Sequence, residues 1–596
     1  MEKQHKKRLL YFLLFITAAV LFIMGKLVSL MILTPLNESP NPIKMPVVER
    51  GPILDRNGKI LAISTRLNSV AAWIPDLEDP EAAAQQLAGI LRKSEGEIIQ
   101  RLKEASGFIY IKRQITPTES RQIEELKNSG NLKGINLIPE FGRNYPEQNL
   151  ASHVIGYVGV DNVGLEGIEY TFNHELSPPI VDNRKSEIYG NQVFLTIDIN
   201  IQYMLQKTAL AALKDNQAEA VFILVMEAKT GEILGYCSVP NFDPNEFSRF
   251  GRSSRQNLPI SKAYEPGSVF KIISIASFLQ LQGITTEDTF LCNGYYEQTL
   301  PDGSTYRIRD LGSHGRVNPQ LIIKYSCNAG AAYASERVDT RSFYRMLTLF
   351  GFGKKTELPL PGESSGILAK PDKWSMRSKP TIAFGQEISV SAIQMLSAAT
   401  VFANSGLLLK PIIVSKIVSP QGKIIKKFNR EPLREVVSPA IAREILEMME
   451  TAVQERGTAR RGRIPGIRIS AKTGTAQVAD PKTGKYSEID FIASYLGIFP
   501  TDDPQLIIYT VIHLPRGDNY YGSRIAAPVF KQTAENLISY LGITRDSDVT
   551  IEHSGTIHLK IPENIKIGST MPDLTGTPKR LLLPLLNQSD IIVRIL

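Results

Sequence analysis

The sequence predicts an α+β fold built from several units, and three observations support this prediction. The chain has 596 residues, which at about 150 residues per domain allows about four units. Strand-like runs near residues 192–237 and 466–514 flank a middle region with helical periodicity. Hydrophobic residues make up 43% and charged residues 21% of the chain, which excludes collagen-like, coiled-coil and wholly disordered proteins.

The N-terminal segment predicts a membrane anchor. Four basic residues within Met1–Arg8 precede an apolar run from Leu9 to Gly25, which resumes after Lys26 and ends at Leu33. About 20 apolar residues cross a bilayer, and a basic leader stays on the cytoplasmic side. A cleaved signal peptide is the alternative, but its apolar region would be shorter and would end in a small-residue cleavage site. We therefore expect residues 1–34 to form a cytoplasmic leader and a single transmembrane helix.

Composition changes along the chain predict three further units. Residues 35–190 begin with a linker and then mix short strands with helices, including one helix expected over Asp79–Leu102. A Pro-rich and polar stretch indicates a boundary near residue 190. Residues 191–545 form the largest unit, and residues 546–596 form a separate tail.

The largest unit begins with a predicted hairpin. Ala220–Met226 and Glu232–Cys237 are strand-like, and Lys229–Gly231 between them is typical of a tight turn. The remaining expected elements are helices over 268–283, 318–337, 389–405, 438–456 and 526–541, with strands over 466–478 and 491–514.

Charge and cysteine content exclude several functions. The 68 basic and 60 acidic residues give a net charge of +8, without the basic, aromatic-interleaved stripe of a nucleic-acid binder. Three cysteines exclude a disulfide scaffold, and Cys237 and Cys292 are expected to be small buried residues. His153 and His314 are isolated in the sequence and are expected to be structural. We therefore expect no metal site and no cofactor.

Ser268 and Lys271 are the first candidate catalytic pair. They follow a Pro-Gly turn and precede an apolar helical run, so both side chains lie on one helical face. A serine hydroxyl is a weak nucleophile until a base accepts its proton. A lysine can act as that base when burial lowers its pKa. The pair alone is weak evidence, because both residue types are common.

Two later motifs strengthen this hypothesis. Ser326-Cys327-Asn328 follows a short helical run, and Lys472-Thr473-Gly474-Thr475 continues a strand-like run. Lys-Thr-Gly also occurs at 229–231 and 482–484, but in polar turns. Ser-x-x-Lys, Ser-x-Asn and Lys-Thr-Gly in this order are typical of serine β-lactamases and penicillin-binding proteins.

Over nearly its full length the chain resembles the class B penicillin-binding proteins, which are monofunctional peptidoglycan D,D-transpeptidases, and within them the division-type FtsI-like members. The segments that carry the resemblance, besides the three motifs, are Arg50–Gly58, Arg143–Pro146, Gly156–Gly159, Gly164–Glu169, Leu195–Asp198, Gly385–Glu387 and Gly457–Ala459. The first four resemble a pedestal or dimerisation domain, which β-lactamases lack. The resemblance implies that residues 35–190 form this pedestal and residues 191–545 a β-lactamase-like transpeptidase domain.

The resemblance also implies catalytic roles. Ser268 attacks the carbonyl between two terminal D-alanines, and Lys271 takes its proton. Ser326 relays a proton to the leaving D-alanine, Asn328 orients Lys271 and the substrate amide, and Lys472 supplies positive charge.

Substrate binding is implied for the Lys-Thr-Gly strand. Thr473 and Thr475 would hold the substrate carboxylate, and Gly474 would allow close backbone approach at the strand edge. The backbone N–H groups of Ser268 and Thr475 would form the oxyanion hole.

The implied partners are peptidoglycan stem peptides ending in D-Ala-D-Ala, β-lactam antibiotics, the membrane, a polytopic glycosyltransferase and divisome proteins. The implied location is the bacterial cytoplasmic (inner) membrane, with the N-terminus inside and the catalytic domain outside. Tyr264–Ser268 resembles division-type members, and Met571–Gly576 resembles the opening of a PASTA module.

Several alternatives stay open at this point. They are an elongation-type transpeptidase, a serine β-lactamase, and a catalytically silent penicillin sensor or division scaffold. Val269 stands where many division-type members have Thr, and Cys327 is either an inert wall residue or a redox-sensitive thiol.

Overall fold

The computed structural model describes residues 2–28, 47–180, 187–300, 302–479, 485–546 and 573–574. The chain divides into one unit that ends at Arg545 and a second unit, Asp546–Leu596. Almost all of the second unit lies outside the described residues, and so does the PASTA-like module expected in the tail. The expected Lys-Thr-Gly turn at 482–484 also lies outside them.

The first helix, α1, spans Glu2–Val28. In the part of the chain that the structure describes, no helix is both long enough and apolar enough to cross a membrane. The transmembrane helix expected within residues 1–34 is therefore not confirmed.

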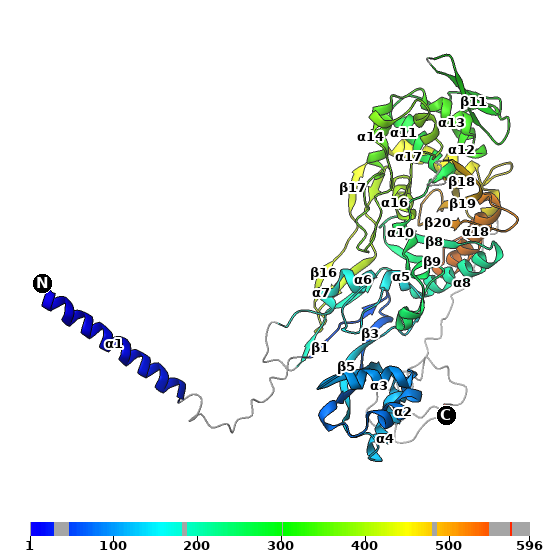
Figure 1. Cartoon of the computed structure of the whole chain (residues 1–596). Helices are drawn as coiled ribbons and strands as arrows, with labels where there is room; N and C mark the ends of the chain where they lie inside the picture. Colours follow the sequence, from blue (N-terminus) through cyan, green and yellow to red (C-terminus); the bar gives the residue numbers. More distant parts are fainter. Residues whose placement is uncertain are drawn as a thin grey trace. The chain divides into compact units, whose positions relative to one another are not determined.

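A five-stranded antiparallel sheet forms the centre of the C-terminal half (Figure 1). Its strand order is β18 (Ser470–Ala479), β19 (Tyr486–Phe499), β20 (Leu506–His513), β8 (Ala220–Glu227) and β9 (Ile233–Val239). The predicted hairpin is confirmed, since β8 and β9 pair in antiparallel fashion with Val221 opposite Val239.

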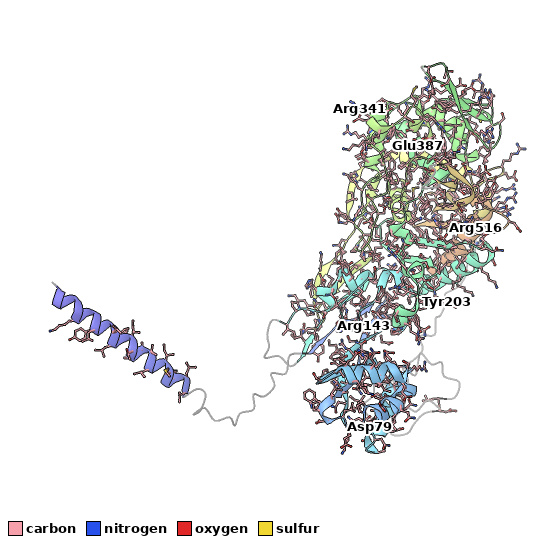
Figure 2. All side chains as sticks on the ribbon, viewed as in Figure 1. Asp79, Arg143, Tyr203, Arg341, Glu387 and Arg516 are labelled. Atoms are coloured by element: carbon pink, nitrogen blue, oxygen red, sulfur yellow. The ribbon has the colours of Figure 1, made fainter. Side chains whose placement is uncertain are left out.

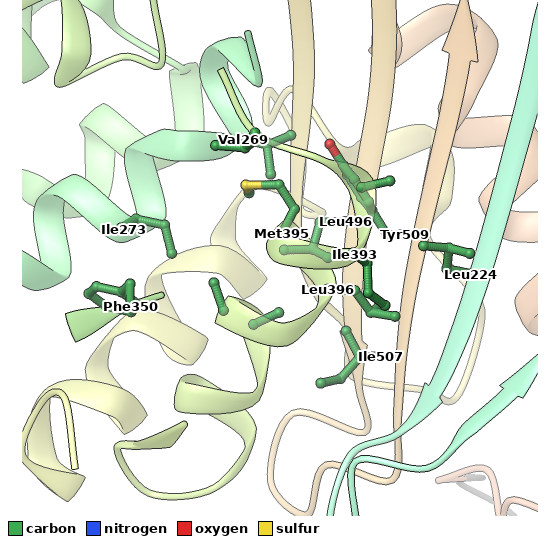
Figure 3. Close-up of a cluster of buried hydrophobic side chains, with 14 of the residues drawn as sticks. Leu224, Val269, Ile273, Phe350, Ile393, Met395, Leu396, Leu496, Ile507 and Tyr509 are labelled. Carbon is green, nitrogen blue, oxygen red and sulfur yellow. The ribbon is translucent and has the colours of Figure 1, made fainter. Parts of the chain in front are cut away.

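Both faces of this sheet are covered by apolar side chains. Strand β8 alternates between two cores: Phe222 and Leu224 join one cluster, and Val221 and Ile223 join another. This alternation follows from the two-residue period of a strand. The first cluster includes helices α11 (Lys271–Gln280) and α16 (Ala392–Ala403), and Figure 3 shows some of its side chains. The second cluster includes α8 (Ile199–Asp215) and α18 (Gly522–Leu541).

Further helices and short strand pairs complete this part of the chain. The other helices here are α12 (Pro319–Tyr325), α13 (Asn328–Ser335), α14 (Thr340–Leu349), α15 (Ser378–Ile382) and α17 (Pro439–Thr451). The strand pairs are β10 (Phe290–Cys292) with β13 (Gly315–Val317), β11 (Tyr295–Thr299) with β12 (Thr305–Arg309), and β14 (Leu407–Leu409) with β17 (Pro432–Glu435).

The single helix expected over 318–337 is wrong. Ser326 takes a left-handed conformation with φ 62°, which ends α12, and α13 begins two residues later. An α-helix cannot continue through such a residue.

A second sheet joins the N-terminal region to the rest of the first unit. Its main strand order is β16 (Ile424–Lys427), β15 (Val414–Val418), β7 (Gln192–Leu195), β2 (Ile53–Leu54), β3 (Ile60–Trp73) and β4 (Phe108–Ile115), and β5 (Ile135–Asn144) pairs with β3. Strands from both sides of residue 190 therefore share one hydrogen-bonded sheet. A further parallel pair joins β1 (Val47–Glu49) to β6 (Glu187–Tyr189).

Helices α2 (Pro80–Leu91), α3 (Glu95–Glu104) and α4 (Pro117–Asn128) share a separate core with β3 and β4 (Figure 1). The single helix expected over Asp79–Leu102 is wrong, because Arg92 takes a left-handed conformation and ends α2. Ser94 then caps α3 by accepting a hydrogen bond from the Glu97 N–H.

Short helices hold a buried ion-pair cluster in this region. They are α5 (Ser152–Ile155), α6 (Gly167–Thr171) and α7 (Asn173–Leu176). Glu169 of α6 accepts a hydrogen bond of 2.6 Å from Arg50 Nε and one of 2.7 Å from Arg143 Nε (Arg143 is labelled in Figure 2). The side chains of Arg50 and Glu169 are 0% exposed. The cluster joins residues that are more than 90 positions apart in sequence, such as Arg50 and Arg143.

We predict that Glu169→Gln destabilises the protein strongly, because it leaves two buried guanidinium groups without a countercharge. The free energy of unfolding should fall by roughly 3–5 kcal/mol. Urea unfolding followed by Trp73 fluorescence, in full-length chains carrying Trp374→Phe, measures this change. Glu81→Gln is the control, since the Glu81–Lys103 pair is more than half exposed and should contribute at most about 1 kcal/mol. Equal effects of the two substitutions would contradict the prediction.

Candidate active site

Ser268 and Lys271 meet at the start of α11. Ser268 lies in a 3₁₀ turn, Gly267–Phe270, which continues directly into α11 at Lys271. The Lys271 amine donates to Ser268 Oγ at 2.7 Å and to Asn328 Oδ1 at 2.6 Å. Both residues therefore share one helical face, as their spacing predicts. The amine lies in direct contact with the hydroxyl whose proton it would accept.

The break between α12 and α13 sets the position of the Ser-Cys-Asn motif. Ser326 closes α12 in its left-handed conformation, and Cys327 caps α13 by accepting a hydrogen bond from the Gly330 N–H at 3.2 Å. Asn328 begins α13 and also donates from Nδ2 to the Arg309 carbonyl at 3.4 Å. A strained backbone position at a functional site is common when the surrounding structure holds it in place.

Lys472 reaches the same site from β18. Its amine donates to Ser326 Oγ at 2.9 Å and to the Thr473 carbonyl at 3.0 Å. The strand lies close to the turn that carries Ser268, since a Cβ on Gly474 would lie 2.7 Å from Val269 Cγ2 and 2.4 Å from Ser494 Oγ. A side chain at this position would collide with Ser494 and Val269 and would press against the Pro266 carbonyl oxygen, 3.0 Å from such a Cβ, so glycine allows this approach.

The turn that carries Ser268 also packs closely against the segment at Gly385. The Gly267 N–H donates to the Gly385 carbonyl at 3.0 Å, and both glycines have positive φ, 57° and 85°. A Cβ on Gly385 would lie 2.1 Å from the Gly267 carbonyl oxygen. The segment Gly385–Glu387, which resembles a family motif, thus packs its backbone directly against the Ser268 turn.

Burial favours neutral amines in this site. Lys271 and Lys472 are both 0% exposed. Burial lowers the pKa of Lys271 from 10.5 to about 8, against the opposing effect of the nearby Asp310. The pKa of Lys472 is lowered well below its usual value, first by burial and then by the charge of Lys271. Two buried amines in one network cannot both carry a proton easily, so one of them is available as a base.

A cavity of about 500 Å³ lies next to the motif residues. Ser268, Ser326, Asn328, Thr473 and Thr475 line it. Its rim carries arginine and tyrosine side chains: Arg307, Arg309, Arg377, Tyr486, Tyr520 and Tyr521. No carboxylate side chain lines this cavity in the described part of the chain. The cavity therefore suits a ligand with a carboxylate and offers no acidic residue to activate water.

The structure brings together every residue singled out in the three motifs. Thr475 Oγ1 already accepts a hydrogen bond from the Gly522 N–H at 3.0 Å, so its hydroxyl proton is free to face the cavity. The Lys-Thr-Gly copy at Lys229–Gly231 lies in the turn between β8 and β9, away from these residues.

Sequence reasoning missed two acidic residues next to the motifs. Glu265 accepts hydrogen bonds from the Glu387 N–H at 2.9 Å and from the Tyr486 hydroxyl at 3.2 Å, and burial raises its pKa to about 7. Asp310 accepts a hydrogen bond from the Ala329 N–H at 3.0 Å, at the start of α13. Only the Glu-Pro-Gly-Ser order pointed toward Glu265, and no local pattern pointed toward Asp310.

Two family descriptions match the chain. The penicillin binding protein transpeptidase domain matches residues 221–535, and the penicillin-binding protein dimerisation domain matches residues 46–179. The first match alone covers more than half of the 596 residues.

Relatives and solved structures agree with these matches. Stage V sporulation protein D of Bacillus subtilis is 32% identical over 518 residues, covering 83% of this chain and 79% of that protein. Peptidoglycan D,D-transpeptidase FtsI of Escherichia coli K12 is 26% identical over 564 residues, covering 90% and 92%. Penicillin binding protein 3 of Mycobacterium tuberculosis, in a complex with aztreonam, superposes with a TM-score of 0.66 at 25% identity and covers 84% and 98%. The chain therefore belongs to the class B penicillin-binding proteins, with a dimerisation domain followed by a transpeptidase domain.

Proposed function

We propose that the protein is a peptidoglycan D,D-transpeptidase that cross-links stem peptides through an acyl-enzyme on Ser268. The observation that carries the proposal is the contact of the Lys271 amine with Ser268 Oγ inside a buried network. E. coli FtsI, a relative across most of its length, is named for the same activity.

The reaction follows from this network. Ser268 Oγ attacks the carbonyl carbon between the two terminal D-alanines, and its proton passes to the neutral Lys271 amine. The backbone N–H groups of Ser268 and Thr475 stabilise the oxyanion. The C–N bond then breaks, and the departing amine of D-alanine takes the proton that Lys271 accepted, relayed through Ser326, which is hydrogen bonded to Lys472. Lys271 is then neutral again.

The second half of the reaction forms the cross-link. An amino group of a neighbouring stem peptide attacks the ester carbon, and the C–O bond to Ser268 breaks. The proton lost by the amine returns to Ser268 through Lys271. Asn328 keeps the Lys271 amine in place throughout by accepting its 2.6 Å hydrogen bond.

Thr473, Gly474 and Thr475 are proposed to bind the substrate. The hydroxyl groups of Thr473 and Thr475 line the cavity and can donate to the terminal carboxylate. The arginines at the rim add positive charge that favours an anionic ligand.

The lining of the cavity disfavours a β-lactamase. Fast hydrolysis of the acyl-enzyme needs a group that activates water, and among the described residues no carboxylate faces the cavity. A penicillin ester on Ser268 should therefore persist. A silent sensor is disfavoured because Ser268, Lys271, Ser326, Asn328 and Lys472 are all present. They form two hydrogen-bonded groups that meet at the Ser-Cys-Asn motif.

We also propose that residues 1–34 attach the protein to the bacterial cytoplasmic membrane, with the remainder outside the cytoplasm. The support is the basic leader and the apolar run that follows it. A role in septal synthesis rests on the resemblance of Tyr264–Ser268 to division-type members, with a polytopic glycosyltransferase and divisome proteins as partners. The B. subtilis relative is named for a stage of sporulation. An elongation role is the alternative.

We predict that Ser268→Ala abolishes covalent labelling by a fluorescent penicillin, lowering it by about 10³-fold or more. Labelling of the full-length chain is read on a denaturing gel, and wild-type label should remain for many minutes. Ser274→Ala, which changes a buried serine of α11, is the control and should label normally. Label on Ser268→Ala would refute the assigned nucleophile, and loss of wild-type label within seconds would favour a β-lactamase.

The pKa of Lys271 predicts how acylation depends on pH. Because the neutral amine is the active form and its pKa is about 8, the acylation rate should fall about tenfold per pH unit below 8 and level off above it. Stopped-flow rates with a chromogenic β-lactam between pH 6 and 9.5 test this. Glu265 has a pKa of about 7 and could also titrate in this range. The Glu265→Gln variant should keep the inflection near pH 8, which would assign the inflection to Lys271. Equal rates at pH 6 and pH 8 would contradict the assignment.

Location in the cell tests the proposed anchor. A fluorescent fusion of the full chain should fractionate with membranes and concentrate at division sites, whereas deletion of residues 1–34 should abolish the membrane association. Signal along the side wall would favour the elongation role. A fusion that stays soluble with residues 1–34 present would refute the anchor.

A further inference from the structure

Four side chains with metal-binding atoms meet beside the Ser-Cys-Asn motif. Cys292 ends β10, Asp310 follows β12, His314 precedes β13, and Cys327 lies between α12 and α13. One ligand atom from each residue lies within 4.8 Å of the others. From the sequence, Cys292 is expected to be a small buried residue, Cys327 an inert wall residue or a redox-sensitive thiol, and His314 a structural residue. This cluster therefore emerges only from the fold.

Four of the six separations in this cluster are close to the edges of a metal-centred tetrahedron. Cys292 Sγ lies 3.6 Å from Asp310 Oδ2 and 3.6 Å from His314 Nδ1. Asp310 Oδ2 lies 3.1 Å from Cys327 Sγ and 3.9 Å from His314 Nδ1. Around a tetrahedral zinc ion, with bonds of about 2.0–2.3 Å, neighbouring ligand atoms lie about 3.3–3.8 Å apart. Small side-chain movements would therefore complete the coordination.

Hydrogen bonding alone leaves this arrangement unexplained. The sulfur of Cys292 is near three groups that can accept, Asp310 Oδ2, the Gly312 carbonyl and His314 Nδ1, at 3.6–3.7 Å. A thiol has one proton and is a weak donor, so it can donate to only one of them, and at least one of these contacts is not a hydrogen bond whichever nitrogen of His314 carries the proton. Cys292 is also 0% exposed. Several electron-rich atoms that converge in a buried space are the arrangement that a cation stabilises.

Surrounding contacts already orient the candidate ligands. The His314 ring stacks on Tyr325 with a centroid distance of 5.6 Å and an angle of 8° between the planes. Asp310 accepts hydrogen bonds from the Leu311 and Ala329 N–H groups. The Gly330 N–H donates to Cys327 Sγ at 3.2 Å and so helps to fix the position of this sulfur. Such outer contacts commonly hold metal ligands in position.

We propose that Cys292, Asp310, His314 and Cys327 form a structural Zn²⁺ site that fixes the start of α13 and thereby positions Asn328. Two thiolates with one imidazole favour zinc over magnesium or calcium. Binding displaces one proton from each thiol, so two thiolates and one carboxylate surround the dication. Four protein ligands leave no open position for a substrate, which makes the site structural and not catalytic.

The proposed zinc site is adjacent in sequence to two residues of the catalytic site. Cys327 lies between Ser326, which contacts Lys472, and Asn328, which contacts Lys271. Loss of the ion would free the loops that hold Asp310 and His314, and with them the start of α13. This effect on acylation rests on the proposed function of Ser268, whereas metal binding itself does not.

Metal content and cobalt spectroscopy test the site. Full-length chain, purified in detergent with a thiol reductant, should contain about one zinc ion per chain. After removal of zinc with a chelator, Co²⁺ titration should give thiolate-to-cobalt absorption and the visible bands of a tetrahedral ion. Cys292→Ser and Asp310→Asn should lower the metal content to well below half and weaken these bands. Cys237→Ala, which removes a buried thiol outside the cluster, should leave both unchanged.

The outcomes separate this proposal from the function of Ser268. Metal-free wild-type protein should acylate several-fold more slowly and recover on zinc addition, while Ser268→Ala should bind zinc normally and take no label. Because chelation needs no substitution, this result does not depend on whether a variant folds. Reduced wild-type protein that binds neither zinc nor Co²⁺ would overturn the proposal. Full metal content in Cys292→Ser would also overturn it.

Discussion

The buried amine of Lys271 is the group on which the catalytic site depends. It is buried and contacts Ser268 and Asn328. A second buried amine, that of Lys472, contacts Ser326, the first residue of the same Ser-Cys-Asn motif. Burial disfavours the charged form, and so turns a residue that is usually a cation into a base near neutral pH. The surrounding fold must keep water away from this amine and yet leave Ser268 open to substrate.

Three structural devices meet this requirement. The 3₁₀ turn before α11 brings Ser268 to the cavity while Lys271 stays in the core. The left-handed Ser326 places one hydroxyl against Lys472 and starts a new helix at Asn328. Gly474 lets β18 approach the Ser268 turn with no side chain between them. Each device comes from a different element, so the five-stranded sheet and its two cores are what hold the site together.

Local patterns predicted the parts of the site that have short-range spacing. The Ser268–Lys271 pair and the strand at Lys472 follow from helical periodicity and β-propensity, whereas the break between α12 and α13 at Ser326 was not predicted. The helix break at Arg92 was missed because the residue type does not reveal that a non-glycine residue takes the left-handed conformation. The cluster of Cys292, Asp310 and His314 was missed for a different reason. Cys292 lies in β10, which pairs with β13, the strand directly after His314, and Asp310 lies in the segment between these strands. Only tertiary packing brings all three to Cys327.

Peptide mapping of the penicillin-treated protein tests the central claim most directly. Full-length chain is incubated with a penicillin of known mass, digested and analysed by tandem mass spectrometry. We expect one adduct per chain, with the added mass of the intact antibiotic, on the peptide that contains Ser268. An adduct on another residue, or an unmodified Ser268 peptide under conditions where the protein is folded, would contradict the account.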